Sequence, residues 1–230
     1  MIGFSEIFSQ VVRLLSGPDA DLLEIVFLSL RVSLTATVLA AVVGLPLGAL
    51  LGMRDFRGKW LITVIVNTLM GLPPVLLGLI VYLFLSRSGP LGFLQLLYTP
   101  TAMIIAQFAL VLPIVTALTR QLIEDSWKEY REPLQSLCVS PAGCVQTLLW
   151  DNRYSLLTAV LAGFSRAISE VGAIIIVGGN IDHLTRMMTT AIALETSKGD
   201  LPLALALGIV LLFIALLVNA AVFSTRWRQV

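Results

Sequence analysis

The sequence predicts an all-α integral membrane protein with about five transmembrane helices, and three observations support this prediction. Of the 230 residues, 57% are hydrophobic and only 13% are charged, which is far more apolar than a water-soluble domain. Several uncharged runs reach the length of about 20 residues that a helix needs to cross the hydrocarbon core. Basic residues gather in alternate connecting segments, as expected of a multi-pass protein. We expect one membrane domain over residues 1–230.

Residues 1–18 predict a helix that lies in the membrane interface. Apolar and polar residues alternate there at helical spacing, but the segment is too short and too polar to cross the bilayer. Gly17 and Pro18 end this helix. The transmembrane core then extends over residues 24–225.

The first span is predicted from Glu24 to Met53. Within it, Gly44, Gly48 and Gly52 recur at every fourth residue and clear one face of the helix. A neighbouring helix can therefore pack closely against that face.

A basic connection follows the first span and predicts which side of the membrane it faces. Arg54, Arg57 and Lys59 form the densest basic cluster of the chain, and short basic loops remain in the cytoplasm. The Gly-Lys pair at residues 58–59 does not belong to a phosphate-binding loop, because the glycine spacing is wrong and Trp60 replaces the Ser or Thr that would hold magnesium. If ATP powers this protein, another polypeptide binds it.

The next two spans each contain proline. The span from Leu61 to Leu85 is interrupted by Pro73 and Pro74, which remove two amide donors and force a kink or a break. This bend either lines a transport pathway or only shapes the helix bundle. The span from Thr101 to Thr119 holds Pro113 as a second predicted kink.

Residues 120–153 predict a polar coupling loop on the cytoplasmic side. One helical face of its first half is apolar, at Trp127, Tyr130, Leu134 and Leu137. Ser140 and Pro141 have the form of an N-cap followed by proline at the first helical position, so a second short helix should run to about Trp150. We expect two short helices joined by a tight turn, whose apolar face packs on the protein itself or docks into a groove on a soluble partner.

The fourth span, Tyr154 to Val177, carries Arg166 and Glu170 in its middle. Residues four apart share a helix face, so the two charges can pair and lower the cost of burial in the membrane. The pair either braces helices or subunits, or contacts a translocated anion. Gly178, Gly179 and Asn180 suit a helix C-terminus.

An outer loop over residues 181–200 and a last span from Leu201 to about Thr225 complete the chain. Arg226 and Arg228 hold the C-terminus in the cytoplasm. The only histidine, His183, is interpreted as a solvated loop residue, because no Ser or Cys partner accompanies it in a recognisable motif. We predict no catalytic residue and no metal site. The two cysteines lack the spacing of a zinc knuckle or a redox pair.

Residues 132–141 read EPLQSLCVSP and resemble the cytoplasmic Glu-Ala-Ala loop in the permease subunits of binding-protein-dependent ABC importers. Glu132 matches the glutamate, Cys138 stands for the glycine of the pattern, and Ser140 with Pro141 matches its Ser-Pro. Pro133 and Leu134 stand for the alanines, and a later Leu-Pro is replaced by Trp-Asp. The residues implied to couple to an ATPase are Glu132, Leu137, Cys138, Ser140 and Pro141.

Three longer segments are similar to the permeases for molybdate, sulfate and tungstate. Residues 163–181, GFSRAISEVGAIIIVGGNI, match their Phe-x-Arg-Ala-x-Gly-Glu-x-Gly-Ala…Gly-Asn-Ile segment, with Ser169 where glycine usually precedes Glu170. Residues 72–92 match their Pro-Pro-Val-x-x-Gly…Gly-Pro-Leu-Gly segment. Residues 185–212 look most like the tungstate branch.

The resemblance implies a type I ABC importer permease fold and a transport subunit that is not an enzyme. It implies a homodimer that forms the pathway for tungstate or molybdate, two cytoplasmic subunits that bind ATP and Mg²⁺, and an external protein that delivers the oxyanion. The chain itself would bind no cofactor. It would contact lipid as a multi-pass protein of the cytoplasmic (inner) membrane of a bacterium or archaeon, with the C-terminus in the cytoplasm. Candidate pathway-lining residues are Pro73, Pro74, Arg166 and Glu170.

Other functions remain open on the sequence. The same fold could carry sulfate or another small anion. A passive channel would not need a docking corner, and an intramembrane hydrolase would need a Ser/His or paired Asp arrangement at membrane depth, where only Arg166 and Glu170 are charged. The net charge of +1 and the scattered basic residues argue against a nucleic-acid partner.

Overall fold

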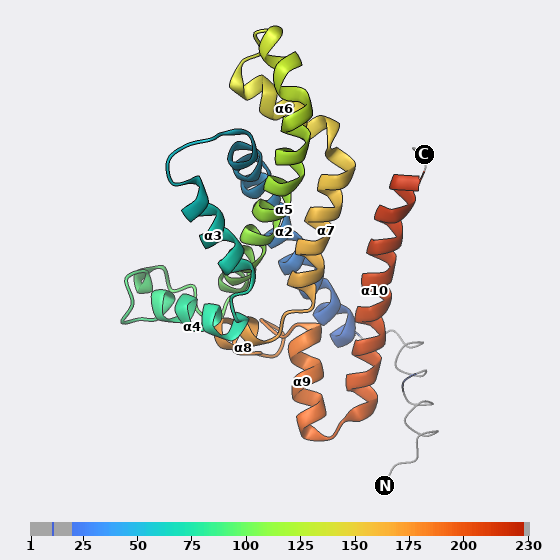
Figure 1. The fold of residues 1–230 in the computed structure, drawn as a ribbon. Coiled ribbons are helices and arrows are strands. Elements are labelled where there is room, and N and C mark those ends of the chain that lie inside the picture. The colour runs from blue at the N-terminus through green and yellow to red at the C-terminus, as the bar shows by residue number, and fades with distance from the viewer. Residues whose placement is uncertain (1–10, 12–19, 228–230) are drawn as a thin grey trace.

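The chain folds into helices throughout the part that the structure describes, which confirms the predicted all-α class. The computed structural model describes Val11 and residues 20–227. Figure 1 shows long helices that run between two ends of the molecule and shorter helices that lie across it. The predicted interfacial helix over residues 1–18 lies, except for Val11, outside the described residues.

Two long helices, α2 (Ala20–Met53) and α5 (Pro100–Ser136), pack along each other at the centre of the fold. A Cβ atom on Gly48 would lie 2.6 Å from the carbonyl oxygen of Thr116, and one on Gly52 would lie 2.9 Å from that of Arg120. Larger side chains at these positions would push the two backbones apart. The first span and its close packing at the glycines are therefore confirmed.

The second span is broken at its two prolines. It consists of α3 (Lys59–Met70) and α4 (Pro74–Leu85), which meet at an angle of 101°. Pro74 is the first residue of α4, a position where its missing N–H costs no hydrogen bond. Of the two outcomes that the sequence left open, the prolines produce a break, and α4 lies across the molecule (Figure 1). A short 3₁₀ helix, η1 (Gly92–Leu94), follows α4.

The third span does not end at Thr119, so the expectation of a separate first coupling helix is wrong. α5 continues from Pro100 through Pro113 to Ser136 as one helix of 37 residues. The second half of α5 is polar but keeps one apolar face, which packs against residues of α2 and α6 beyond Thr119. The second coupling helix, α6 (Pro141–Asp151), is confirmed within one residue of the predicted end.

The fourth span is also broken, although the sequence predicts one straight helix. α7 (Arg153–Ile168) and α8 (Gly172–Gly178) meet at 59°. α8 ends as predicted, since Gly179 and Asn180 have φ angles of 72° and 51° in the left-handed region.

The predicted outer loop over residues 181–200 contains a helix, which corrects that prediction. α9 (Met188–Lys198) packs against α10 (Leu201–Trp227), which is the predicted last span. Met188 and Thr190 are fully buried. The sequence predicts a loop there because the segment connects two predicted spans and is too short to cross the membrane itself.

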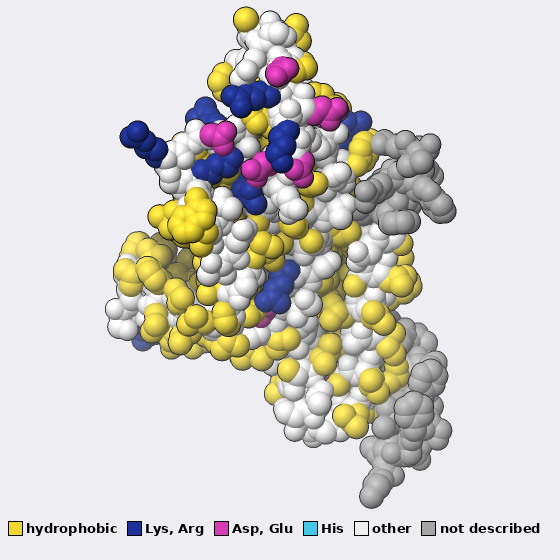
Figure 2. Space-filling model, viewed as in Figure 1, with side chains coloured by type: hydrophobic (Ala, Val, Ile, Leu, Met, Phe, Trp, Pro, Cys, Tyr) yellow, Lys and Arg dark blue, Asp and Glu magenta, His cyan; other side chains and the backbone are white. Residues whose placement is uncertain are grey.

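In the described part of the chain, three helices are each long and apolar enough to cross a membrane, and the number is up to five if each bent pair is one span. The predicted five crossings equal that upper number. Figure 2 shows most charged side chains of this face gathered at one end of the molecule, above an apolar body. We call this end, formed by residues 54–59, 120–132 and α6, the polar end.

Ion pairs tie the connection between α2 and α3 to α5 at the polar end. Lys59 Nζ lies 3.0 Å from Asp55 Oδ1 and 3.8 Å from Glu124 Oε1, and Glu124 also pairs with Arg120. The basic cluster predicted to lie in the cytoplasm therefore shares one side with the predicted coupling loop.

Candidate coupling and transport sites

The turn between α5 and α6 places the five predicted coupling residues at the tip of the polar end. Cys138 has a φ of 52°, the left-handed conformation that glycine adopts at no steric cost. The Ser140 hydroxyl accepts a hydrogen bond from the Gly143 N–H at 3.2 Å, and Pro141 begins α6. Because Cys138 reverses the chain and Ser140 restarts the helix, this turn has a fixed shape.

The apolar face of the polar end is divided between packing and exposure. Trp127, Tyr130 and Leu134 pack in a cluster with residues of α2 and α6. In contrast, Leu137 is 73% exposed at the turn. Glu132 and Cys138 are exposed beside it. We call the segment from Glu132 to Pro141 the corner.

Polar contacts hold the corner to the rest of the polar end. The Ser126 hydroxyl donates to Asn152 Oδ1 at 3.0 Å, which joins α5 to the start of α7. The Asn152 side-chain amide in turn donates to the Leu148 carbonyl of α6 at 3.0 Å. The corner is therefore an exposed tip on a fixed base.

The break between α7 and α8 places Glu170 in the interior. Its side chain is 4% exposed, whereas that of Arg166 is 37% exposed, and Arg166 Nη2 lies 3.7 Å from Glu170 Oε2. The two charges pair as predicted, but they do not share a helix face, because α7 ends at Ile168. Glu170 Oε1 instead accepts the Ala173 N–H at 3.3 Å, at the start of α8.

Buried side chains satisfy the carbonyl groups that the break releases. Gln107 of α5 donates to the Ala167 carbonyl at 2.9 Å, and Thr189 of α9 donates to the Glu170 carbonyl at 2.8 Å. At the other end of α8, the Thr185 hydroxyl donates to the Gly178 carbonyl at 2.6 Å. Irregular backbone at membrane depth requires such partners, so α8 is held at both ends.

The two broken spans meet each other. A Cβ atom on Gly78 of α4 would lie 2.7 Å from the Cα of Ala173 in α8. A Cβ atom on Gly172 would lie 2.6 Å from Val75 Cγ2 and 3.7 Å from Glu170 Oε1. The structure therefore brings the Pro73 and Pro74 break close to Glu170, whereas the coupling residues lie apart from them at the polar end.

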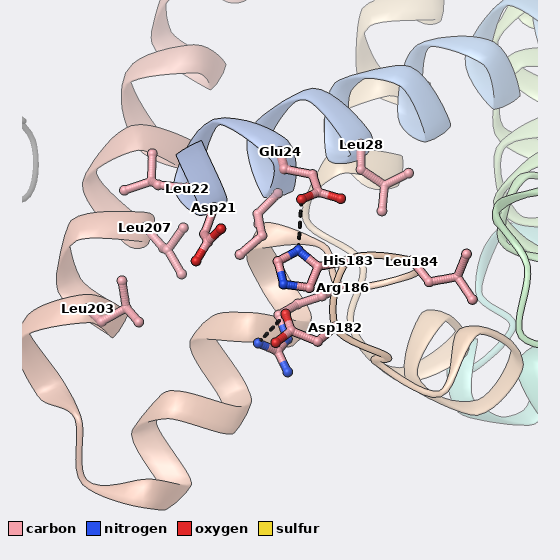
Figure 3. A pocket seen from close by; sticks show the side chains of 11 residues that line it. Asp21, Leu22, Glu24, Leu28, Asp182, His183, Leu184, Arg186, Leu203 and Leu207 are labelled. Atoms are coloured by element: carbon pink, nitrogen blue, oxygen red, sulfur yellow. Dashed lines mark hydrogen bonds and ion pairs between the residues drawn. The ribbon is translucent and has the colours of Figure 1, made fainter. Parts of the chain in front are cut away.

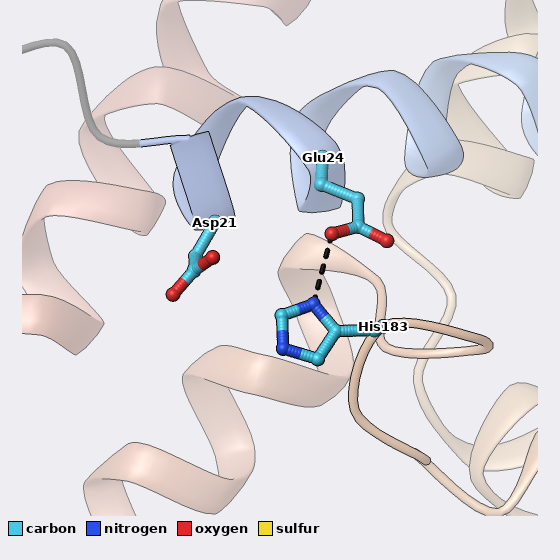
Figure 4. Close-up of side chains that lie close together, drawn as sticks. All are labelled: Asp21, Glu24 and His183. Atoms are coloured by element: carbon cyan, nitrogen blue, oxygen red, sulfur yellow. Dashed lines mark hydrogen bonds and ion pairs between the residues drawn. The ribbon is translucent and has the colours of Figure 1, made fainter.

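A third group of polar residues was not expected from the sequence. Asp21 and Glu24 from the start of α2 meet His183 near a pocket of about 150 Å³ (Figure 3). The ligand atoms of these three residues all lie within 4.8 Å of one another. His183 Nδ1 lies 2.9 Å from Glu24 Oε2, the contact drawn in Figure 4.

The charges around His183 favour its protonated form. The hydrogen bond to Glu24 raises the pKa of His183 most, and the nearby carboxylates of Asp182 and Asp21 raise it further. We interpret the His183–Glu24 contact as a polar link between α2 and the segment before α9. His183 is 62% exposed, as predicted, but Glu24 lies 159 residues away, so no local pattern could reveal the pair.

Comparison with known proteins identifies relatives over nearly the whole chain. Residues 44–225 match the family model of the binding-protein-dependent transport system inner membrane component. The tungstate uptake system permease protein TupB of Peptoclostridium acidaminophilum is 46% identical over 96% of this chain and 97% of its own length. The TupB protein of Campylobacter jejuni is 41% identical over 92% and 89% of the two chains. A probable anion ABC transporter permease protein of Haloferax volcanii is 42% identical over 90% and 91%.

Proposed function

Because this chain belongs to the family of binding-protein-dependent transport system inner membrane components, we propose that it forms the pathway of an ATP-driven tungstate importer. The observation that carries the proposal is the 46% identity, over 96% of the chain, to a tungstate uptake permease. Molybdate, also a tetrahedral dianion, is the second expected cargo.

The proposed assembly contains two copies of this chain. Two cytoplasmic subunits bind ATP and Mg²⁺, and a protein on the external side delivers the oxyanion. The assembly lies in the cytoplasmic membrane of a bacterium or archaeon, in contact with lipid. Basic residues at the polar end, among them Arg54, Arg57 and Lys59, support a cytoplasmic position for that end and for the C-terminus.

In the proposed mechanism, the corner carries force from the ATPase subunits into the membrane. Leu137 supplies the apolar contact, while Cys138 and Ser140 fix the shape of the turn. When the ATPase subunits close, they move the end of α5, and α5 packs on α2, α7 and α8. Because α5 contacts both broken spans directly, its movement would shift them without an intervening flexible segment.

The broken spans are the proposed pathway elements. Pro73 and Pro74 set the break between α3 and α4, and Arg166 and Glu170 lie at the break between α7 and α8. Glu170 is buried and paired, so it acts as a brace. The Arg166 side chain is partly exposed and lies 3.7 Å from its partner, so it retains donors for a passing anion.

A test of coupling is the substitution Leu137→Asp in the assembled importer. Burial of a leucine side chain contributes about 1.5–3 kcal/mol, so the loss of this contact should lower tungstate-stimulated ATP hydrolysis by about tenfold or more. The matched control is Phe56→Asp, which places the same charge on a residue that is 43% exposed at the same end but outside the corner. Full stimulation in Leu137→Asp, or in a deletion of residues 132–141, would favour a passive channel.

The cargo is tested separately, by uptake into proteoliposomes that contain the whole importer. Tungstate and molybdate should drive ATP hydrolysis and accumulate inside. Sulfate is the alternative cargo, and accumulation of sulfate in preference to tungstate would reassign the substrate while leaving the importer function intact.

A further inference from the structure

A pocket of about 670 Å³ lies beside the end of α4, and nothing in the proposed mechanism uses it. Its walls come from the last turn of α4, the following turn and the segment after η1. The polar side chains that matter here are Ser86, Arg87, Ser88, Gln95 and Tyr98. We call it the outer pocket, because the proposed orientation puts this end of α4 on the external side.

Arg87 gives the outer pocket a positive charge that nothing nearby offsets. It is the only charged residue in the sequence between Lys59 and Arg120. No Asp or Glu lines the pocket. Among the described residues, the guanidinium group of Arg87 has no ion-pair or hydrogen-bond partner, so its five N–H donors remain available. The pocket is therefore a place where an anion is favoured.

The carbonyl groups at the end of α4 would repel an anion, but donors of the same turn already occupy them. The Tyr82 carbonyl accepts the Ser86 N–H at 2.8 Å, and the Leu83 carbonyl accepts the Ser86 hydroxyl at 3.1 Å. The Phe84 carbonyl accepts the Leu91 N–H at 2.9 Å. This arrangement blunts the negative end of the helix dipole.

Two glycines make this tight turn possible. A side chain on Gly89 would clash with the carbonyl oxygen of Leu83, and one on Gly92 would clash with that of Ser86. They belong to the Gly-Pro-Leu-Gly sequence at residues 89–92. The wall of the outer pocket therefore has a defined shape that presents Arg87 and Ser88.

The opposite wall of the outer pocket connects it to α8. The Tyr98 N–H donates to the Val177 carbonyl at 2.9 Å, and a Cβ atom on Gly179 would lie 2.8 Å from Tyr98 Cδ1. Tyr98 and Gln95 both have left-handed backbone conformations, with φ angles of 60° and 48°. An ion in the outer pocket would therefore lie beside a wall that is fixed to one of the two pathway elements.

We propose that the outer pocket binds a tetrahedral oxyanion, with Arg87 as its charged ligand and Ser88 and Gln95 as neutral donors. The planar guanidinium group can bind two oxygens of a tungstate or molybdate ion through parallel N–H bonds. A single positive charge against a dianion gives weak binding, which suits a site that receives an ion and then releases it. The identity of the ion rests on the proposed function, whereas the site itself rests on the pocket.

The test measures tungstate binding by the permease–ATPase complex in lipid nanodiscs, without the external binding protein. Equilibrium dialysis with mass-spectrometric detection of tungsten gives the bound amount. Wild type should bind saturably, and Arg87→Gln should weaken binding about tenfold. The matched control is Arg57→Gln, which removes the same charge from an exposed arginine at the polar end and should bind as wild type does.

The phosphate of a lipid headgroup shares this chemistry, so the experiment is run with phosphatidylcholine and with phosphatidylglycerol, and retained lipid phosphorus is measured. Tungstate binding that depends on Arg87 in both lipids supports the proposal. Equal binding by wild type and Arg87→Gln overturns it, as does a change in retained phosphorus without tungstate binding. Arg87-dependent binding of sulfate but not tungstate would keep the oxyanion pocket and overturn the tungstate assignment.

Discussion

Glu170 shows how this protein keeps a carboxylate inside a membrane domain. An isolated charge there would cost several kcal/mol, but each part of this residue has a partner. Its two carboxylate oxygens face Arg166 and the Ala173 N–H, and its carbonyl oxygen accepts the Thr189 hydroxyl. Because its carboxylate and carbonyl oxygens are all used within the fold, we expect Glu170 to hold the break in place.

His183 leads to a prediction about the pH on the side of the membrane that we propose to be external. The pKa of His183 is raised in the folded protein, so its contact with Glu24 stabilises the fold fully below the unfolded pKa of about 6.5. This stabilisation is lost as the pH rises through the folded pKa. Hydrogen exchange of residues 181–186, corrected for intrinsic rates, should therefore accelerate as pH rises through that window. The effect should be modest because the pair is exposed.

The control for this prediction is His183→Gln, which keeps a hydrogen-bonding side chain but cannot gain the charge. Its exchange should show no corresponding pH dependence. If the variant and the wild type respond to pH alike, the ion pair with Glu24 does not hold this segment.

The sequence predicts the conformation of a residue well when the signal comes from its neighbours in the chain. Ser140 and Pro141 predict the start of α6, and Gly179 and Asn180 predict the end of α8. The donors to the Ala167 and Glu170 carbonyl groups could not be predicted in this way, because Gln107 and Thr189 come from other helices. The His183 pair with Glu24 was missed for the same reason.

Among the helices, α8 is unusual for its short length and for the chain breaks at both of its ends. It has seven residues, is too short to cross a membrane and lies between a 59° break and a left-handed turn. Its position depends on partners from α5, α9 and the 181–187 segment, and on close contact with α4 at Gly78. Such an element can change position when its neighbours move.

The Thr189 hydroxyl should be necessary for that position. Thr189→Val keeps the shape of the side chain but leaves the Glu170 carbonyl buried without a donor, at a cost of about 1–3 kcal/mol. We expect a lower thermal midpoint for the assembled complex and a smaller ratio of stimulated to basal ATP hydrolysis. Thr189→Ser retains the hydroxyl and should restore both. Wild-type values in Thr189→Val would show that the hydrogen bond does not hold the break.

The sequence predicts most helices of this fold because the length of an apolar run and the capping residues at its ends are both visible in neighbouring residues. It does not predict where α5 ends, since the apolar face of the helix continues beyond Thr119. It also misses the break at Ser169, because no proline marks that position and the released carbonyl groups are satisfied by distant residues. α9 was missed because it is too short to be a span, and its packing against α10 is a contact that the sequence does not show.

For the whole molecule, the distribution of charge argues for a single orientation in the membrane. The polar end carries a network around Lys59 and Glu124. A second charged group, around Glu24 and His183, lies at the opposite end of α2. The apolar surface between them is widely exposed in a single chain and needs lipid or a second copy to cover it.

The two cysteines offer a direct test of orientation. Cys138 is exposed at the corner and Cys144 is buried. With the permease expressed without its ATPase subunits, a membrane-impermeant maleimide should label Cys138 in inside-out vesicles and not in intact spheroplasts. Ser88→Cys in a Cys138→Ser background should show the opposite pattern, because Ser88 lines the outer pocket. Labelling of Cys138 from outside the cell would reverse the proposed orientation.

The continuity of α5 has a consequence for how the protein can be regulated. A helix of 37 residues is about 55 Å long, so α5 connects the corner directly to the helices that pack along its other half. In the proposed mechanism, a tilt imposed at the corner is carried along α5 to α7 and α8, on either side of Glu170. By the same route, an ion bound near the two broken spans would alter ATP hydrolysis by the proposed ATPase subunits.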